Sequence, residues 1–171
     1  MLVVVLVAGC DPAVVEPPPG MVAAGNTSPL LAPSRATFNP VDDVLQASCG
    51  TLDCHGQVGR NLRLYGGRGL RLSPQGNSAD DPTTPDEYNA SYFSVIGLEP
   101  EIMSRVVADK GQHPERLTIV RKARNLEHHK GGKLFTAGDD RDRCLTSWLA
   151  GTVDMDACRR GKDLPRPGAM P

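Results

Sequence analysis

Aromatic side chains are scarce in this chain, which has one Trp, three Tyr and three Phe among 171 residues. Hydrophobic residues make up 39% and charged residues 23%, as in a soluble globule. The length suits one ordinary domain with tails and excludes a multi-domain machine. With 18 glycines and 15 prolines but so few rings, the core needs apolar bulk from another source, and a bound ligand is one such source.

An excess of either charge is also missing, since 19 Lys and Arg face 20 Asp and Glu for a net charge of -1. General binding to the phosphates of nucleic acid depends on a basic excess, so we expect no nucleic-acid partner. The sequence shows no internal repeat, and no catalytic base, nucleophile or phosphate-binding loop stands out. It therefore favours a carrier or binding protein over an enzyme.

A hydrophobic run long enough to span a membrane is likewise missing. The apolar stretch 2–7 is far shorter than the roughly 20 residues that a membrane-spanning helix needs. It suits a secretory signal, and its ending, Leu6-Val7-Ala8-Gly9-Cys10, resembles a bacterial lipobox. We therefore predict a signal peptide over 1–9 and a lipid on Cys10. No Lys or Arg precedes the stretch, which indicates that the true start lies upstream.

The segment after Cys10 predicts a tether. Residues 11–37 hold six prolines and three charges, and they would reach at most about 80–90 Å at ~3.1 Å per residue. A buried strand ending at Cys10 is the alternative to the signal peptide, but the Pro-rich segment that follows could not continue such a strand. The polar, basic and Pro-rich residues 159–171 predict a disordered tail. The folded unit is therefore expected at 38–158, after a tether over 10–37.

Helix signals dominate the folded unit. Asn39 is a suitable N-cap for a helix from about 40 to 48. A second helix is expected at 86–96, capped by Asp86, and a third from Pro100. The last helix should open at 138–140 and close at Gly151. Two segments stay open: 61–72 predicts either a short hairpin or an extended loop, and 115–122 is ambiguous. The fold class is mainly α with long Gly-rich loops.

Two cysteines and a histidine lie together in Cys49-Gly50-Thr51-Leu52-Asp53-Cys54-His55-Gly56. A cysteine pair ending in an adjacent histidine is what covalent haem attachment requires, because two thiols add to the vinyl groups and the imidazole binds the iron. The usual motif has two residues between the cysteines, and this one has four. On a helix, a spacing of five residues separates the thiols by about 140°, so the extra residues must bulge out, and Gly50 could permit this.

The same residues also allow a disulfide, a zinc site or a catalytic nucleophile. Cys49 and Cys54 could form a disulfide beside a bystander histidine. A zinc site would need a fourth ligand from distant cysteines. A Cys/His nucleophile is disfavoured, since two such close cysteines tend to pair in an oxidising compartment.

The chain resembles the class I, cytochrome c-like domains of bacterial lipoproteins over residues 38–158. The likeness is carried by 49–56, by Gly69-Leu70-Arg71-Leu72, by His129-Lys130-Gly131-Gly132, and by 140–151 with its apolar stripe. It implies a small helical domain whose first and last helices cross near one covalent haem c. Cys49 and Cys54 would form the thioethers, and His55 would be the proximal iron ligand.

The distal ligand in such domains is often a methionine before the last helix, but none lies between Met103 and Met155. His129 is the first candidate and His128 the second, with an exposed basic loop as the alternative. Met103 is an outside candidate, although a helical methionine among apolar neighbours is more often core. Two histidine ligands would give a lower potential than a methionine ligand.

The remaining cysteines, Cys144 and Cys158, are not followed by histidine, which argues against a second haem. A disulfide between them would contribute about 3 kcal/mol. Residues 105–133 hold eight basic and three acidic residues; most of this is expected to be a solvated face, which could also neutralise haem propionates or dock an acidic redox partner.

Together these features predict a monomeric, membrane-tethered monohaem cytochrome that exchanges electrons with redox proteins. Its location would be the bacterial cell envelope, facing the periplasm or the cell surface. The alternative is a haem-free cytochrome-like lipoprotein that is stabilised by disulfides and acts as a structural or binding module. A peroxidase or gas-sensing role would require His129 not to bind.

Overall fold

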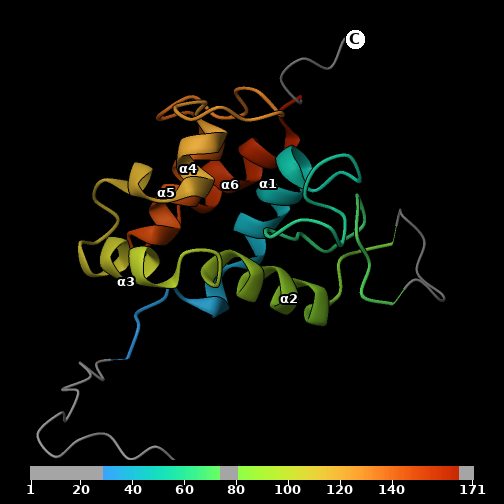
Figure 1. Ribbon diagram of the computed structural model, residues 1–171, viewed down its shortest axis with the longest axis horizontal. Coiled ribbons are helices and arrows are strands. Elements are labelled where there is room, and N and C mark those ends of the chain that lie inside the picture. The colour runs from blue at the N-terminus through green and yellow to red at the C-terminus, as the bar shows by residue number, and fades with distance from the viewer. Residues whose placement is uncertain (1–28, 74–80, 166–171) are drawn as a thin grey trace, which may run out of the picture.

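The computed structural model describes residues 29–73 and 81–165. Within these ranges the protein is mainly helical and has no named β-strand, which confirms the predicted fold class. The helices are α1 (Asn39–Cys49), α2 (Pro85–Ile96), α3 (Pro100–Ala108), α4 (Thr118–Ala123), α5 (Asp140–Leu149) and α6 (Met155–Asp163), with short 3-10 turns at Arg35–Thr37 and Pro114–Arg116 (Figure 1). No helix in these ranges is both long and apolar enough to cross a bilayer.

The first two helices occur where they were predicted, but their caps differ. The N-cap of α1 is Phe38, and Asn39 instead accepts a hydrogen bond from Arg35. The N-cap of α2 is Thr84, not Asp86, because Thr84 and Glu87 form a reciprocal capping box. The Thr-x-x-Glu spacing was a readable signal for this box. Gly97 does end α2, as expected.

The C-terminal end of the fold differs more from the prediction. Helix α5 starts after its N-cap Asp139, but it is followed by α6, which continues past residue 158. A disulfide joins Cys144 on α5 to Cys158 on α6, as predicted. The expectation of a disordered tail from 159 is therefore wrong up to residue 163, because the crosslink and the buried Gly161 hold this stretch against the core.

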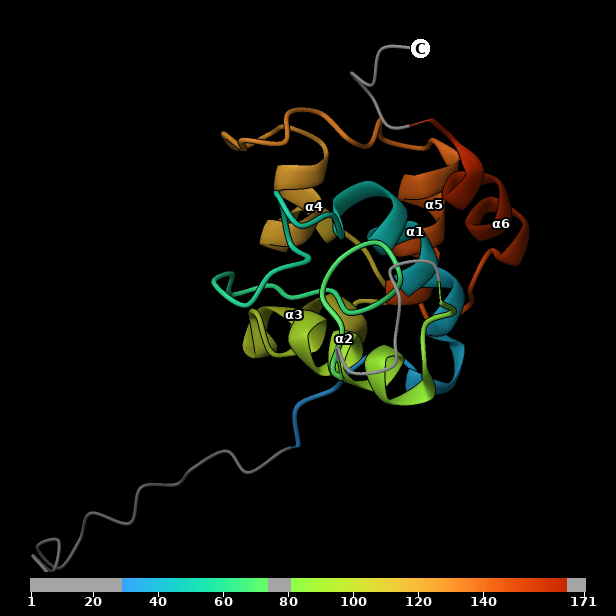
Figure 2. The ribbon, with the colours of Figure 1, turned by 90° about the vertical axis from the view of Figure 1, so that its right-hand side faces the viewer.

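Helices α1, α5 and α6 pack against one another and form what we call the helical frame (Figure 2). Three of the seven aromatic residues cluster here: the Phe38 ring lies 4.9 Å from the Trp148 ring and 5.4 Å from the Tyr92 ring, centre to centre. Trp148 of α5 is 1% exposed and donates its indole N–H to the carbonyl of Ser34. These rings give this part of the core its apolar bulk.

Residues 31–37 also belong to the fold. Tyr92 donates its hydroxyl to the carbonyl of Pro33, and the backbone N–H of Leu31 donates to Ser104. The tether predicted over 10–37 therefore ends earlier, near residue 30. The predicted signal peptide, Cys10 and the tether up to residue 28 lie outside the described residues.

The loop between α1 and α2 is built on glycines. Gly56 and Gly69 press against the carbonyl of Gly50, and a Cβ at either position would lie within 2.0 Å of that oxygen. Of the two predictions for 61–72 the extended loop holds, since only an isolated bridge pairs Tyr65 with Leu70 within the described part of this stretch. The ambiguous segment 115–122 becomes the second 3-10 turn and α4.

Candidate functional site

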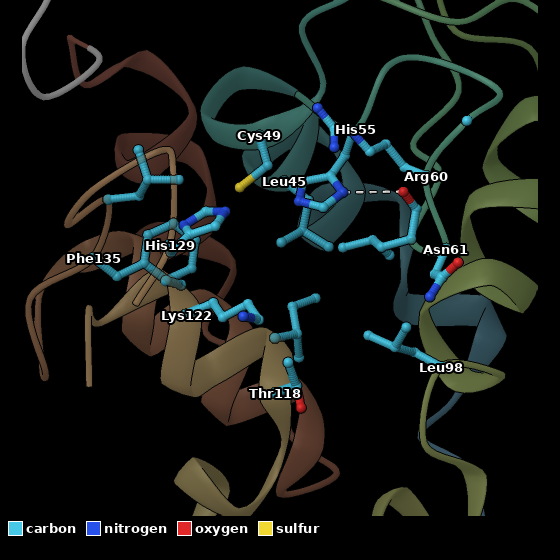
Figure 3. Close-up of a pocket in the computed structure, with 15 residues that line it drawn as sticks. Leu45, Cys49, His55, Arg60, Asn61, Leu98, Thr118, Lys122, His129 and Phe135 are labelled. Atoms are coloured by element: carbon cyan, nitrogen blue, oxygen red, sulfur yellow. Dashed lines mark hydrogen bonds between the residues drawn. The ribbon is translucent and has the colours of Figure 1, made fainter. Parts of the chain in front are cut away.

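An apolar cavity of about 350 Å³ lies between the loop after α1, helix α4 and the segment before α5 (Figure 3). This volume is within the range of about 300–1,000 Å³ for small-molecule sites. The walls combine aliphatic side chains and the Phe135 ring with several polar side chains, two of them histidines. They are formed by Leu45, Cys49, His55, Gly59, Arg60, Asn61, Leu62, Leu98, Thr118, Ile119, Lys122, Ala123, His129, Leu134 and Phe135.

His55 is firmly held in this cavity. Its backbone N–H donates to the carbonyl of Cys49 at 2.9 Å, and its own carbonyl accepts from Leu64. Its ring Nδ1 lies 3.0 Å from the carbonyl of Leu62, which can only accept, so the proton sits on Nδ1. Burial lowers the pKa of His55, the hydrogen bond with the Leu62 carbonyl opposes this, and the charges of His129 and Arg60 add to the lowering. With the proton on Nδ1, Nε2 is available as a metal ligand.

His129 reaches the cavity from the loop after α4. Its Nδ1 is buried and has no hydrogen-bond partner among the described residues. The ring lies close to the backbone of Gly131, where a Cβ would come within 2.9 Å of Cε1. Leu134 and Phe135 bring the chain back to α4, because both backbone N–H groups donate to the carbonyl of Ala123. The loop thus directs an imidazole with an unsatisfied nitrogen into an apolar space.

The two imidazoles face each other across the cavity, each with a ring nitrogen toward the other (Figure 3). Their ring centres are 6.1 Å apart and their planes are inclined by 24°. Two metal–nitrogen bonds of about 2.0–2.1 Å, each extended by about 1.1 Å to the ring centre, would separate two opposed imidazoles by about 6.3 Å. The spacing between the ring centres is therefore compatible with one metal ion held by His55 and His129.

The two motif cysteines occupy different positions. Cys49 is the last residue of α1, is buried, and directs its sulfur into the cavity (Figure 3). Cys54 is half-buried and is not among the lining residues. The residues between them do not bulge from a continuing helix, because α1 ends at Cys49 and the N–H groups of Cys54 and Gly56 both donate to the carbonyl of Thr51. The four-residue insert is therefore a compact turn.

Gly50 serves this turn by its lack of a side chain. Its φ of -82° is ordinary for any residue. A Cβ at this position would, however, lie 2.8 Å from the Cα of Gln46. Gly50 is therefore needed for the close approach to Gln46, not for a bulge in the helix as predicted.

The other candidate ligands lie elsewhere. His128 is exposed, and its carbonyl accepts from Lys122. Met103 is 2% exposed in the core and does not line the cavity. Three or more His, Cys, Asp or Glu side chains do not gather as metal ligands anywhere in 29–73 or 81–165. Of the predicted residues, the structure brings together Cys49, His55 and His129.

Two basic side chains stand at the edge of the cavity. Arg60 donates to the carbonyl of Cys54. Lys122 forms an ion pair with Glu127 at 2.8 Å. Four of the eight basic residues in the stretch 105–133 form ion pairs, as in Arg116 with Asp109. The stretch is therefore in part a salt-bridged surface.

Some functional residues were missed at the level of sequence. The Leu62 carbonyl that fixes His55 is a backbone group, which no side-chain pattern reveals. Leu134 and Phe135 had an available signal, since they follow the Gly-Gly turn after one lysine, but a two-residue apolar run is ambiguous alone.

Searches with the chain found no matching protein-family model, no curated protein and no solved structure.

Proposed function

We propose that this protein is a membrane-tethered monohaem c-type cytochrome that carries single electrons outside the cytoplasm. The observation that carries the proposal is the opposed pair His55 and His129, whose ring centres are 6.1 Å apart across an apolar cavity. Cys49 lies at the same cavity and Cys54 directly precedes His55. This is the residue set that covalent haem attachment with two axial imidazoles needs.

The residues of the chain have distinct tasks in this proposal. Cys49 and Cys54 would hold haem c through thioethers, and His55 and His129 would be its axial ligands. The haem, when bound, supplies the one-electron redox centre. The carbonyl of Leu62 keeps His55 in the tautomer that leaves Nε2 for the iron. The apolar walls around Phe135 exclude water, which together with two nitrogen ligands sets the potential.

Electron transfer is favoured over catalysis because both axial positions would be filled by the protein. A substrate could then reach the iron only by displacing an imidazole. The predicted lipid on Cys10 would keep the protein in the bacterial cell envelope, where it would meet redox protein partners as a monomer. The sequence of the signal and the tether supports this part of the proposal.

Haem attachment is tested by exporting the full chain in a bacterial host that has the haem-ligation machinery. The absorption spectrum is then recorded under denaturing conditions. A Soret band that stays with the polypeptide is expected, and it should disappear when Cys49→Ser and Cys54→Ser are combined. A purified native chain without the band would refute the cytochrome.

The axial ligand is tested by His129→Ala, with His128→Ala as the matched control. The two histidines are adjacent, but only His129 lines the cavity. His129→Ala should move the spectrum toward five-coordinate iron, while His128→Ala should leave it unchanged. Equal spectra for both variants would remove His129 from the site.

A haem-free lipoprotein that acts as a structural or binding module is the second candidate. It is favoured by the position of Cys54, which does not line the cavity. In that case Cys49 and Cys54 would form a disulfide, and the cavity would accept a different apolar ligand. The denatured protein would then have no Soret band, and a thiol titration would find neither residue reactive.

A further inference from the structure

Three exposed apolar side chains lie on and beside the N-terminal segment of the described chain. Leu30 is 56% exposed, Leu31 is 48% exposed, and Phe93 on α2 is 59% exposed. These three residues border one apolar hollow of about 230 Å³, which Met103 closes from below. We call this surface the leucine face. Apolar groups grouped in this way on a soluble protein indicate contact with a partner or a membrane.

The leucine face is held in place by hydrogen bonds. The backbone N–H of Leu31 donates to Ser104 on α3 at 2.9 Å. A few residues further along, the carbonyl of Pro33 accepts from Tyr92, and that of Ser34 accepts from Trp148. Because these donors belong to packed helices, the leucines are fixed on the surface and are not part of a freely moving tether.

Shared lining residues relate the leucine face to the cavity that His55 and His129 line, which we call the histidine cavity. The hollow beside Leu31 shares Phe93 and Gly97 with a second hollow of about 340 Å³. That hollow in turn shares Asn61 and Leu98 with the histidine cavity. Asn61 and Leu98 lie together at one edge of the cavity in Figure 3. The second hollow therefore adjoins both the leucine face and the histidine cavity.

We infer that the leucine face rests on the lipid bilayer and places the hollow that adjoins the histidine cavity near the membrane. The inference rests on the lipid anchor of the proposed function. Eighteen residues, 11–28, separate Cys10 from the described chain. The described chain begins at residue 29, directly beside the exposed leucines. The predicted lipid is therefore attached on the side of the chain that carries this face.

The chemistry of the face suits an interfacial contact. Two leucines and a phenylalanine can enter the boundary between headgroups and acyl chains, where apolar side chains gain free energy. This contact is weak alone, and the covalent anchor supplies the second attachment that stable binding needs. An electron partner would then meet the protein close to the bilayer.

The test places a fluorescent reporter on the face. Phe93→Trp is prepared in the full lipidated chain, with Leu126→Trp as the control at a site of similar exposure, 64%. Leu126 follows α4, whose loop lies at the opposite end of the molecule from the N-terminal segment (Figure 1). Trp148 is buried in both proteins and gives a constant background. Each protein is bound to vesicles of phosphatidylethanolamine and phosphatidylglycerol with brominated acyl chains.

Brominated chains quench an indole that enters the bilayer boundary. We expect the added emission of F93W to fall by about half, and that of L126W to be unchanged. Equal quenching of the two proteins, or none in either, would overturn the inference while leaving the anchor intact. Failure of the native chain to float with vesicles would refute both. A dimer in solution that Phe93→Ser dissociates would assign the face to a second copy instead.

Discussion

The helical frame and the histidine cavity meet at Cys49, but different interactions hold them together. In the frame, a disulfide between Cys144 and Cys158 crosslinks α5 and α6, and Trp148 of α5 is fully buried. The cavity is enclosed largely by loops, and its two histidines depend on backbone contacts. One of these, His129, keeps an unsatisfied buried nitrogen.

This difference separates stability from function. Burial and crosslinking of the frame residues stabilise the folded state, so replacing these residues should destabilise the protein. An unsatisfied polar group costs free energy, and such a group persists where a ligand meets it. His129 should therefore be replaceable with little loss of stability. The following predictions test this division.

The largest effect is expected for Trp148→Ala, which removes the centre of the aromatic cluster. Loss of a fully buried Trp side chain should lower the free energy of unfolding by about 4 kcal/mol. Urea denaturation followed by circular dichroism measures it, since the only tryptophan is lost. Trp148→Phe should recover most of the stability. A loss below about 1 kcal/mol would contradict the importance of this cluster.

The next effect concerns the disulfide between α5 and α6. Replacing Cys144 and Cys158 together by Ser should lower the free energy of unfolding by about 3 kcal/mol, because the unfolded chain loses its crosslink. Reduction of the native protein should have a similar effect, measured under the same denaturing conditions. An unchanged urea midpoint would show that packing alone holds α6.

Asp42, a buried residue of α1, makes the stability of the helical frame depend on pH. Burial raises its pKa to about 8, with Asp43 adding to the rise and hydrogen bonds from Gln46 and Ser91 and the charge of Arg35 opposing it. The folded state thus keeps a proton that the unfolded state has lost, so stability is fully present below pH 4 and decreases as the pH rises to 8.

Each unit of pKa difference between the folded and unfolded states changes the free energy of unfolding by about 1.4 kcal/mol. Relaxation of the protein around the charged carboxylate reduces the total, and we expect a decrease of about 2 kcal/mol. Urea titrations at pH 5 and pH 8 measure it. Asp42→Asn should reduce the difference, whereas the exposed Asp86→Asn should not. A native protein that is more stable at pH 8 than at pH 5 would contradict the protonated state of Asp42.

The smallest effect is expected in the cavity. In protein prepared without haem, His129→Ala should change the free energy of unfolding by less than about 0.5 kcal/mol, since it removes a half-buried side chain with an unsatisfied nitrogen. Chemical denaturation beside the native chain is sufficient. A loss comparable to that of the disulfide variant would mean that His129 belongs to the frame.

Much of the local structure could be predicted because its causes are local. Apolar spacing located α1, α2, α3 and α5, and the cysteine count led to the pair that is crosslinked. Helix α6 was missed because its nine residues are mostly polar or charged, and the disulfide and packing against α1 and α5 hold it in place. The cap of α2 was placed at Asp86, although Thr84 and Glu87 carried the stronger signal.

The candidate site was predictable in its residues and not in its geometry. The adjacency of Cys54 and His55, and the histidines before a Gly-Gly turn, could be read directly. No sequence pattern distinguishes His129 from His128, because the choice depends on how the loop returns to α4 through Leu134 and Phe135.

The sequence by itself determined the mainly helical class, the pairing of Cys144 with Cys158 and the identity of the histidines near a cysteine pair. These depend on residue type and short spacing. Only the tertiary structure decided that His55 and His129 face each other across one cavity and that Cys49, more than Cys54, borders it. Both results need segments more than seventy residues apart to pack together, and that packing is a property of the whole fold.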